Sequence, residues 1–141
     1  MGLTLCGKFK ESPSYDMGYG SFYRLRCDIA NTVSKEFGKH YRDIYKVQIC
    51  PKEVLDEYNR RTESLIKKYK CKERFLEFLY LPDTEGKLSP FKCKAVMEQI
   101  TDLKNTDLYG YTAYPETCMT IEKFRELLNL CYNKRKYLIW Y

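Results

Sequence analysis

The segment 18–21 reads Gly-Tyr-Gly-Ser and stands directly before a stretch whose apolar residues follow helical spacing. Glycine lets a ligand approach the backbone, and the first amide N–H groups of a helix have no partner inside the helix. These amides and the positive end of the helix dipole favour a bound anion, although glycines before a helix are also ordinary turn residues. Two arginines off the apolar stripe could add guanidinium contacts to a phosphate. The predicted ligand contacts here are Tyr19, Gly20, Ser21, Arg24 and Arg26.

A second candidate is the segment 108–115, where three tyrosines surround Gly110 in a long connection between two predicted helices. Long ordered loops in compact domains are often functional. Tyrosine rings can stack on a base while their hydroxyls reach ribose or phosphate. We expect Tyr109 and Tyr111 to contact the ligand. The alternative is that these rings close the end of a small helical core.

Cysteine and histidine offer little metal or nucleophile chemistry in this sequence. The seven cysteines lie far apart, at positions 6, 27, 50, 71, 93, 118 and 131. Zinc sites usually use close Cys or His pairs, so we expect no metal site and small buried thiols in a reducing cytoplasm. His40, the only histidine, is the one candidate base for a Ser–His–Asp or Cys–His arrangement. It follows a predicted helix end at Gly38, where we expect a partly exposed loop residue or a cation near the helix end.

Gly86 follows two acidic residues, Asp83 and Glu85, as in the calcium loop of EF-hand proteins. Aligned on that glycine, the first ligand position is Leu81 and the bidentate glutamate position is Lys92. Calcium would lose its strongest oxygen ligands, so the segment predicts a tight turn leading into a helix. The sequence also lacks a Walker A loop, a dinucleotide fingerprint and an HExxH motif. We therefore expect a non-catalytic protein without a cofactor and keep a cryptic nucleotide-cleaving enzyme, using carboxylates and tyrosines, as an alternative.

The net charge of +6 at pH 7 favours an anionic partner such as a nucleotide, a nucleic acid or an acidic protein surface. Basic residues are densest at 67–72 and 134–136, which we interpret as solvated helix ends because cations suit the negative end of the helix dipole. No apolar run approaches the length of a membrane span or a signal peptide. We expect a cytoplasmic protein with no membrane partner.

Five segments with helical apolar spacing must position these candidates, at 21–37, 51–69, 75–79, 90–103 and 120–131. Leu3, Leu5 and Phe9 predict a strand, and the aromatic and β-branched tail 137–141 is too short for a helix. The tail could pair with the first strand and tie down both termini. With no internal repeat or linker, residues 1–141 predict a single mainly α (α+β) domain of about five helices.

The segments 18–26 and 83–94 resemble a family of small uncharacterised proteins found in phages, prophages and bacteria. The first reads GYGSFYRLR and matches the family pattern Gly/Ser-Tyr-Gly/Ser-x-Phe-x-x-Phe/Leu-Arg. The second reads DTEGKLSPFKCK and matches Asp-x-Asp/Glu-Gly-x-Leu/Ile-x-Pro-x-x-Cys-Lys, with Pro82 where the family often carries His or Ser.

This resemblance implies a phage or prophage protein, and small phage proteins without catalytic motifs commonly interfere with host machinery. We expect a counter-defence protein that sequesters a nucleotide-derived signalling molecule. The alternative is an inhibitor that binds a host protein or nucleic acid through its basic helix ends. Self-association into a homo-oligomer is left open.

Overall fold

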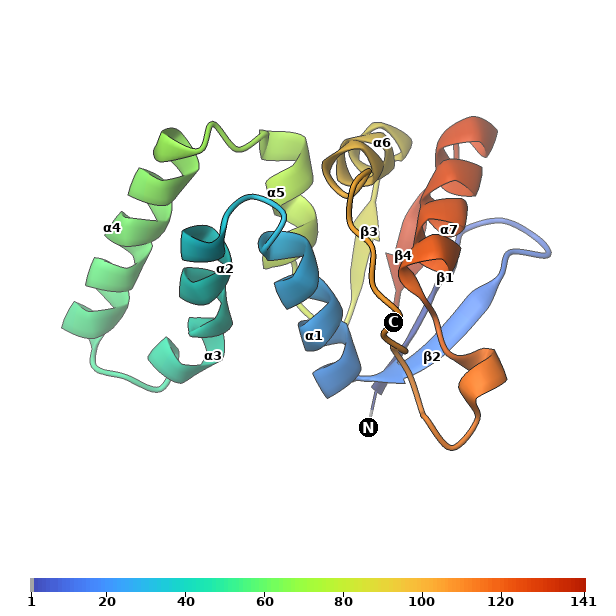
Figure 1. Cartoon of the computed structure of the whole chain (residues 1–141), viewed down its shortest axis with the longest axis horizontal. Helices are drawn as coiled ribbons and strands as arrows, with labels where there is room; N and C mark the ends of the chain where they lie inside the picture. The colour runs from blue at the N-terminus through green and yellow to red at the C-terminus, as the bar shows by residue number, and fades with distance from the viewer. Residues whose placement is uncertain (1) are drawn as a thin grey trace.

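The computed structural model describes residues 2–141, which form seven α-helices and a four-stranded antiparallel sheet (Figure 1). The strands are β1 (Gly2–Gly7), β2 (Ser14–Gly18), β3 (Gly86–Leu88) and β4 (Leu138–Trp140), in the order β2-β1-β4-β3. The fold is therefore mainly α with a small sheet, which confirms the predicted α+β class. Strands β1 and β4 pair, so both ends of the chain lie in one sheet, as the sequence predicts.

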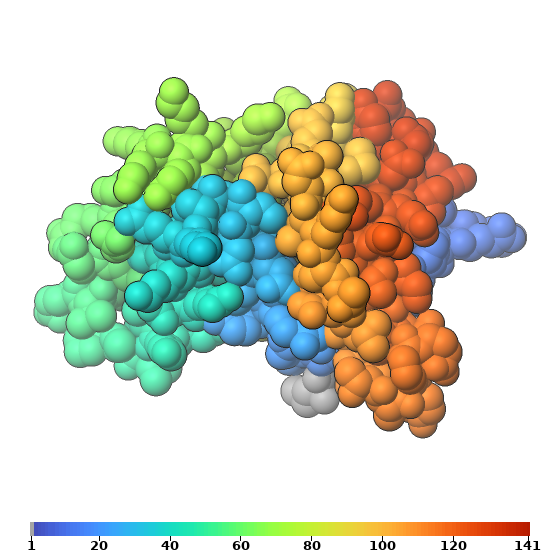
Figure 2. Space-filling view, viewed as in Figure 1, coloured from blue at the N-terminus to red at the C-terminus, as the bar shows by residue number. Residues whose placement is uncertain are grey.

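The helices lie on one side of this sheet, and some of them extend beyond it (Figure 1). They are α1 (Tyr19–Ala30), α2 (Lys35–Arg42), α3 (Ile44–Val47), α4 (Lys52–Lys68), α5 (Glu73–Tyr80), α6 (Pro90–Gln99) and α7 (Ile121–Lys134), with a 3-10 turn at Pro115–Thr117. Helices α2 to α4 stand away from the sheet (Figure 1), and the turn between β1 and β2 projects at the other end of the molecule (Figure 2). No helix between residues 2 and 141 is both long enough and apolar enough to cross a membrane.

Trp140 on β4 joins the sheet to the helical core. Its ring lies 5.5 Å from Phe22 of α1 and 5.8 Å from Phe78 of α5, measured between ring centres. The indole N–H donates to the carbonyl of Pro82 at 2.9 Å. A side chain at Gly86 would collide with the indole ring, so β3 approaches this closely only because the residue is glycine.

The predicted helix 21–37 is two helices, and the predicted helix end at Gly38 is wrong. Helix α1 ends at Ala30, and Ser34 caps α2 by accepting a hydrogen bond from the amide of Phe37 at 2.9 Å. Gly38 lies within α2, where a Cβ atom would collide with Asn31. The glycine permits the close turn between α1 and α2, a packing role that resembles a C-cap in the sequence alone.

Other element boundaries follow their local signals more closely. Thr120 caps α7 by accepting a hydrogen bond from the amide of Lys123 at 3.2 Å, and α5 ends before Pro82. Strand β3 lies where the sequence predicts a tight turn, and the sequence predicts no strand at β2. Both form edges of the sheet and contain Gly or Asp, residues of low β-propensity, so pairing with a neighbouring strand defines them.

Candidate ligand-binding site

The structure brings together the two segments that were predicted separately to hold a ligand. The hydroxyl of Ser21 donates to the carbonyl of Gly110 at 3.4 Å. Arg24 donates to the carbonyl of Leu108, and its guanidinium carbon lies 5.1 Å from the ring centre of Tyr109. The start of α1 and the segment 108–115 therefore contact each other, although the polar groups at this contact are already bonded to other protein groups.

Tyr109 closes the end of the core in this contact. Its side chain is fully buried, its hydroxyl donates to the carboxylate of Asp28 at 2.6 Å, and it accepts from the amide of Asn105 at 3.1 Å. Burial and the Asp28 carboxylate raise the pKa of the Tyr109 phenol above its ordinary value. Tyr111, by contrast, is 49% exposed. The two tyrosines thus differ in their access to a ligand.

The first turn of α1 remains open on one side. A Cβ atom at Gly20 would meet nothing within 4 Å. The N-cap residue Gly18 offers no side-chain hydrogen bond, and no acidic residue lies in the first turn. The half-buried Tyr19 packs against the core. Space is therefore open beside Gly20, and none of five surface grooves in the described chain is lined by a residue of this turn.

Arg26 lies inside the core although its spacing places it off the apolar stripe of α1. Its side chain is 2% exposed, and its guanidinium carbon lies 4.2 Å from the ring centre of Phe22 and 5.6 Å from those of Phe78 and Trp140. Within residues 2–141, its Nε and Nη2 atoms have no hydrogen-bond acceptor. Buried polar atoms without a partner are costly, and no other charged side chain of the described residues has such atoms.

Several polar residues lie around Arg26, and Tyr41 is close enough to hydrogen-bond to its side chain. Burial lowers the pKa of Arg26, and Tyr41, Tyr45 and Asp83 oppose this effect. The hydroxyl of Tyr45 donates to the carboxylate of Asp83 at 3.3 Å, and the ring of Tyr45 lies 5.1 Å from that of Tyr23. Tyr45 is 39% exposed, so this Tyr45–Asp83 contact lies at the protein surface. No ion pair of the described residues includes Arg26.

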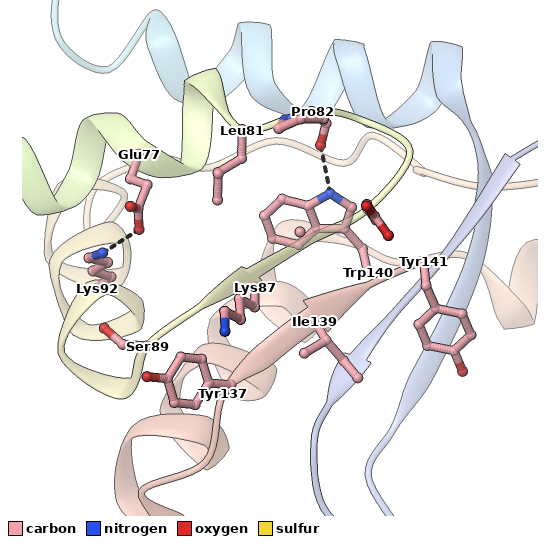
Figure 3. A pocket seen from close by; sticks show the side chains of 12 residues that line it. Glu77, Leu81, Pro82, Lys87, Ser89, Lys92, Tyr137, Ile139, Trp140 and Tyr141 are labelled. Atoms are coloured by element: carbon pink, nitrogen blue, oxygen red, sulfur yellow. Dashed lines mark hydrogen bonds and ion pairs between the residues drawn. The ribbon is translucent and has the colours of Figure 1, made fainter.

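A groove of about 680 Å³ runs along the free edge of β3, with Trp140 in its wall (Figure 3). This volume lies in the range typical of small-molecule sites. Lys87 holds its ammonium 5.8 Å from the ring centre of Tyr137, and Lys92 pairs with Glu77 at 2.5 Å. The remaining lining residues are Leu81, Pro82, Glu85, Gly86, Ser89, Ile139 and Tyr141. Because Trp140 also contacts the guanidinium of Arg26, one side chain links the groove to the unpaired cation.

His40 was predicted in a partly exposed loop, and this part of the prediction is wrong. It lies in the last turn of α2 and is 8% exposed. Its ring stacks on Tyr58 with centres 3.9 Å apart, and Nε2 lies 2.7 Å from the hydroxyl of Thr62. Desolvation lowers the pKa of His40. Between residues 2 and 141, no group of three or more metal-ligating side chains gathers at one place.

The structure places residues beside Arg26 that the sequence does not relate to it. The sequence predicts Trp140 only as part of a strand, and no local pattern connects Tyr45 to the arginine. The charge of Asp83 acts on the pKa of Arg26, although the two residues lie far apart in the sequence. No protein-family model, curated protein or solved structure matches the chain.

Proposed function

We propose that this is a non-catalytic binding protein that holds a small, anionic, nucleotide-like ligand on Arg26. The observation that carries the proposal is that one edge of a buried guanidinium has no hydrogen-bond acceptor. Nε and Nη2 form one side of this planar group, the side that grips a carboxylate or phosphate with two parallel hydrogen bonds. Buried polar groups nearly always have a partner, and an anion would supply two at once.

The proposed entrance is the surface contact between Tyr45 and Asp83. Its 3.3 Å length makes it a weak hydrogen bond. Tyr45 belongs to α3, a helix of four residues of which none is fully buried, so this helix has less packing to lose on moving than the longer helices. Moving this short helix would expose Arg26, and an incoming phosphate would replace the more distant charge of Asp83.

A nucleotide-like ligand also matches the aromatic surroundings. A base can stack on the half-exposed ring of Tyr45 while the phosphate reaches Arg26. Together with the resemblance to phage proteins, this favours a counter-defence role in which the protein sequesters a nucleotide-derived signal. Ligand contacts by Tyr19, Gly20, Ser21, Arg24, Tyr109 and Tyr111 stay predictions.

Trp140 provides a direct test because it is the only tryptophan in the chain and contacts Arg26. Titration with inorganic phosphate, nucleoside mono- and diphosphates and cyclic dinucleotides should give a saturable change in tryptophan emission for at least one of them. Arg26→Met should abolish the change. Arg60→Met removes an exposed arginine of α4 and should leave it intact. If no compound alters the emission or the melting temperature, the proposal is wrong.

The fate of the ligand separates a binding protein from the alternative of a nucleotide-cleaving enzyme. A ligand bound by the protein and then released by heat denaturation should return intact. Recovery of a cleaved product, in amounts that grow with incubation time, would instead establish an enzyme. Chromatography of the released material, with Arg26→Met protein as the control, measures this outcome.

A further inference from the structure

Two surface rings outside the Arg26 site each carry cations over their faces. The guanidinium carbons of Arg74 and Arg135 lie 5.5 and 5.8 Å from the ring centre of Phe91. Arg135 also lies 4.7 Å from the ring centre of Tyr132, and the ammonium of Lys94 lies 5.3 Å from it. The two rings are 6.3 Å apart. We call these five residues the basic aromatic track.

The track is assembled from three helices, and one of its cations, Arg135, belongs to a basic run of the sequence. Lys72, the last residue of the run 67–72, immediately precedes α5, and Arg135 lies in the run 134–136 at the end of α7. The start of α5, helix α6 and the end of α7 lie side by side along the upper edge of Figures 1 and 2. Next to Arg135 in the sequence, Lys134 holds its ammonium 5.4 Å from the ring centre of Phe9. This further pair of a cation and a ring extends the pattern toward the β1–β2 turn.

The charges of the track are largely free to meet a partner. Among the ion pairs of residues 2–141, none includes Arg74 or Arg135, and Lys94 makes only a 3.9 Å contact with Glu98. Phe91 is 55% exposed, which is unusual for a phenylalanine. Arg135 and Lys94 also hold the pKa of the Tyr132 phenol below its ordinary value, a sign of positive potential at this surface.

We propose that the basic aromatic track binds single-stranded nucleic acid. A single strand alternates flat bases with negatively charged phosphates, and the track alternates rings with cations. A duplex hides the faces of its bases, and an acidic peptide has no flat group for Phe91 to stack on. Single-stranded DNA or RNA is therefore the polyanion that uses both parts of the surface.

Fluorescence anisotropy of labelled single-stranded oligonucleotides, titrated at several salt concentrations, tests this proposal. The double variant Arg74→Gln/Arg135→Asn removes two charges, and asparagine tolerates the left-handed backbone at position 135. It should reduce the slope of log affinity against log salt by roughly 1.4, since each phosphate contact contributes about 0.7 for single strands. The double variant Lys39→Gln/Lys52→Gln loses the same charge outside the track and should keep the slope.

Phe91→Leu tests stacking, because it keeps the charge and an apolar side chain but removes the ring. Stacking of one base on an aromatic ring is worth enough that affinity should fall about tenfold. Unchanged affinity in this variant, or duplex DNA binding as tightly as a single strand, would overturn the proposal. Polyglutamate that competes as well as an oligonucleotide would point to an acidic protein partner and also overturn it. Failure of a single strand to bind even at low salt would contradict it as well.

Discussion

The guanidinium carbon of Arg26 lies 5.6 Å from the ring centre of Trp140, in a core where two of the arginine's nitrogen atoms have no acceptor. The rings of Phe22 and Phe78 complete an aromatic enclosure around the charge. Such contacts stabilise a cation but do not fill its hydrogen-bonding positions. These two nitrogen atoms therefore carry a desolvation cost that the proposed anion would reduce.

Arg26→Met should leave the protein at least as stable as the original, because an apolar side chain of similar length replaces a buried charge that has no ion-pair partner. Replacement of buried charges by apolar residues is often neutral or stabilising by about 1–4 kcal/mol. Urea denaturation followed by circular dichroism measures the free energy of unfolding. A loss of more than about 2 kcal/mol would mean that the fold itself requires this cation.

Gly86→Ala should destabilise the protein, because its methyl group would collide with the Trp140 ring in a packed core. Overpacking of this kind typically costs about 1–3 kcal/mol. Gly20→Ala is the matched control, since its methyl group meets nothing within 4 Å and alanine favours the helix by about 0.5–1 kcal/mol. Thermal unfolding should thus shift in opposite directions for the two variants. Equal shifts would contradict the close approach of β3 to Trp140.

His40 should make stability depend on pH below about 6.5, the ordinary pKa of the imidazole. Because desolvation lowers its pKa in the folded protein, the unfolded chain binds the proton more readily. Stability should therefore fall as the pH drops from 6.5 through the lower folded pKa, and be retained above that window. His40→Gln should flatten the pH dependence of urea midpoints between about pH 7 and pH 5. An identical profile in this variant would assign the effect to other groups.

Thr120→Ala should lower the free energy of unfolding by about 1 kcal/mol, because it removes the side-chain cap of α7. Ser89 occupies the equivalent position before α6 but makes no capping hydrogen bond. Ser89→Ala should therefore have a much smaller effect. Equilibrium urea unfolding of both variants compares the caps directly, and a larger loss for Ser89→Ala would reverse the assignment.

Much of the helical framework could be predicted because its signals are local. The stripe at 121, 124, 127, 128 and 131 is buried throughout, and Thr120 begins the helix as its residue type indicates. The interruption between α1 and α2 could not be predicted in the same way. The apolar spacing of Phe22, Leu25, Ile29, Val33 and Phe37 stays in phase across the turn, and Gly38 imitates a helix end while serving a contact with Asn31.

The sequence by itself determined the mixed helical class, the pairing of β1 with β4, the start of α6 at Pro90 and the cap of α7 at Thr120, since these depend on periodicity and residue type over a few positions. Pro51 precedes α4 as its N-cap and does not lie in the first turn, where it was predicted. Only the tertiary structure decided where the charges lie. Arg26 is buried because rings from α1, α5 and β4 close around it, and Arg74 and Arg135 both reach Phe91 because α5, α6 and α7 pack together. Side chains so far apart along the chain leave no local pattern, because their contacts arise only when the helices pack.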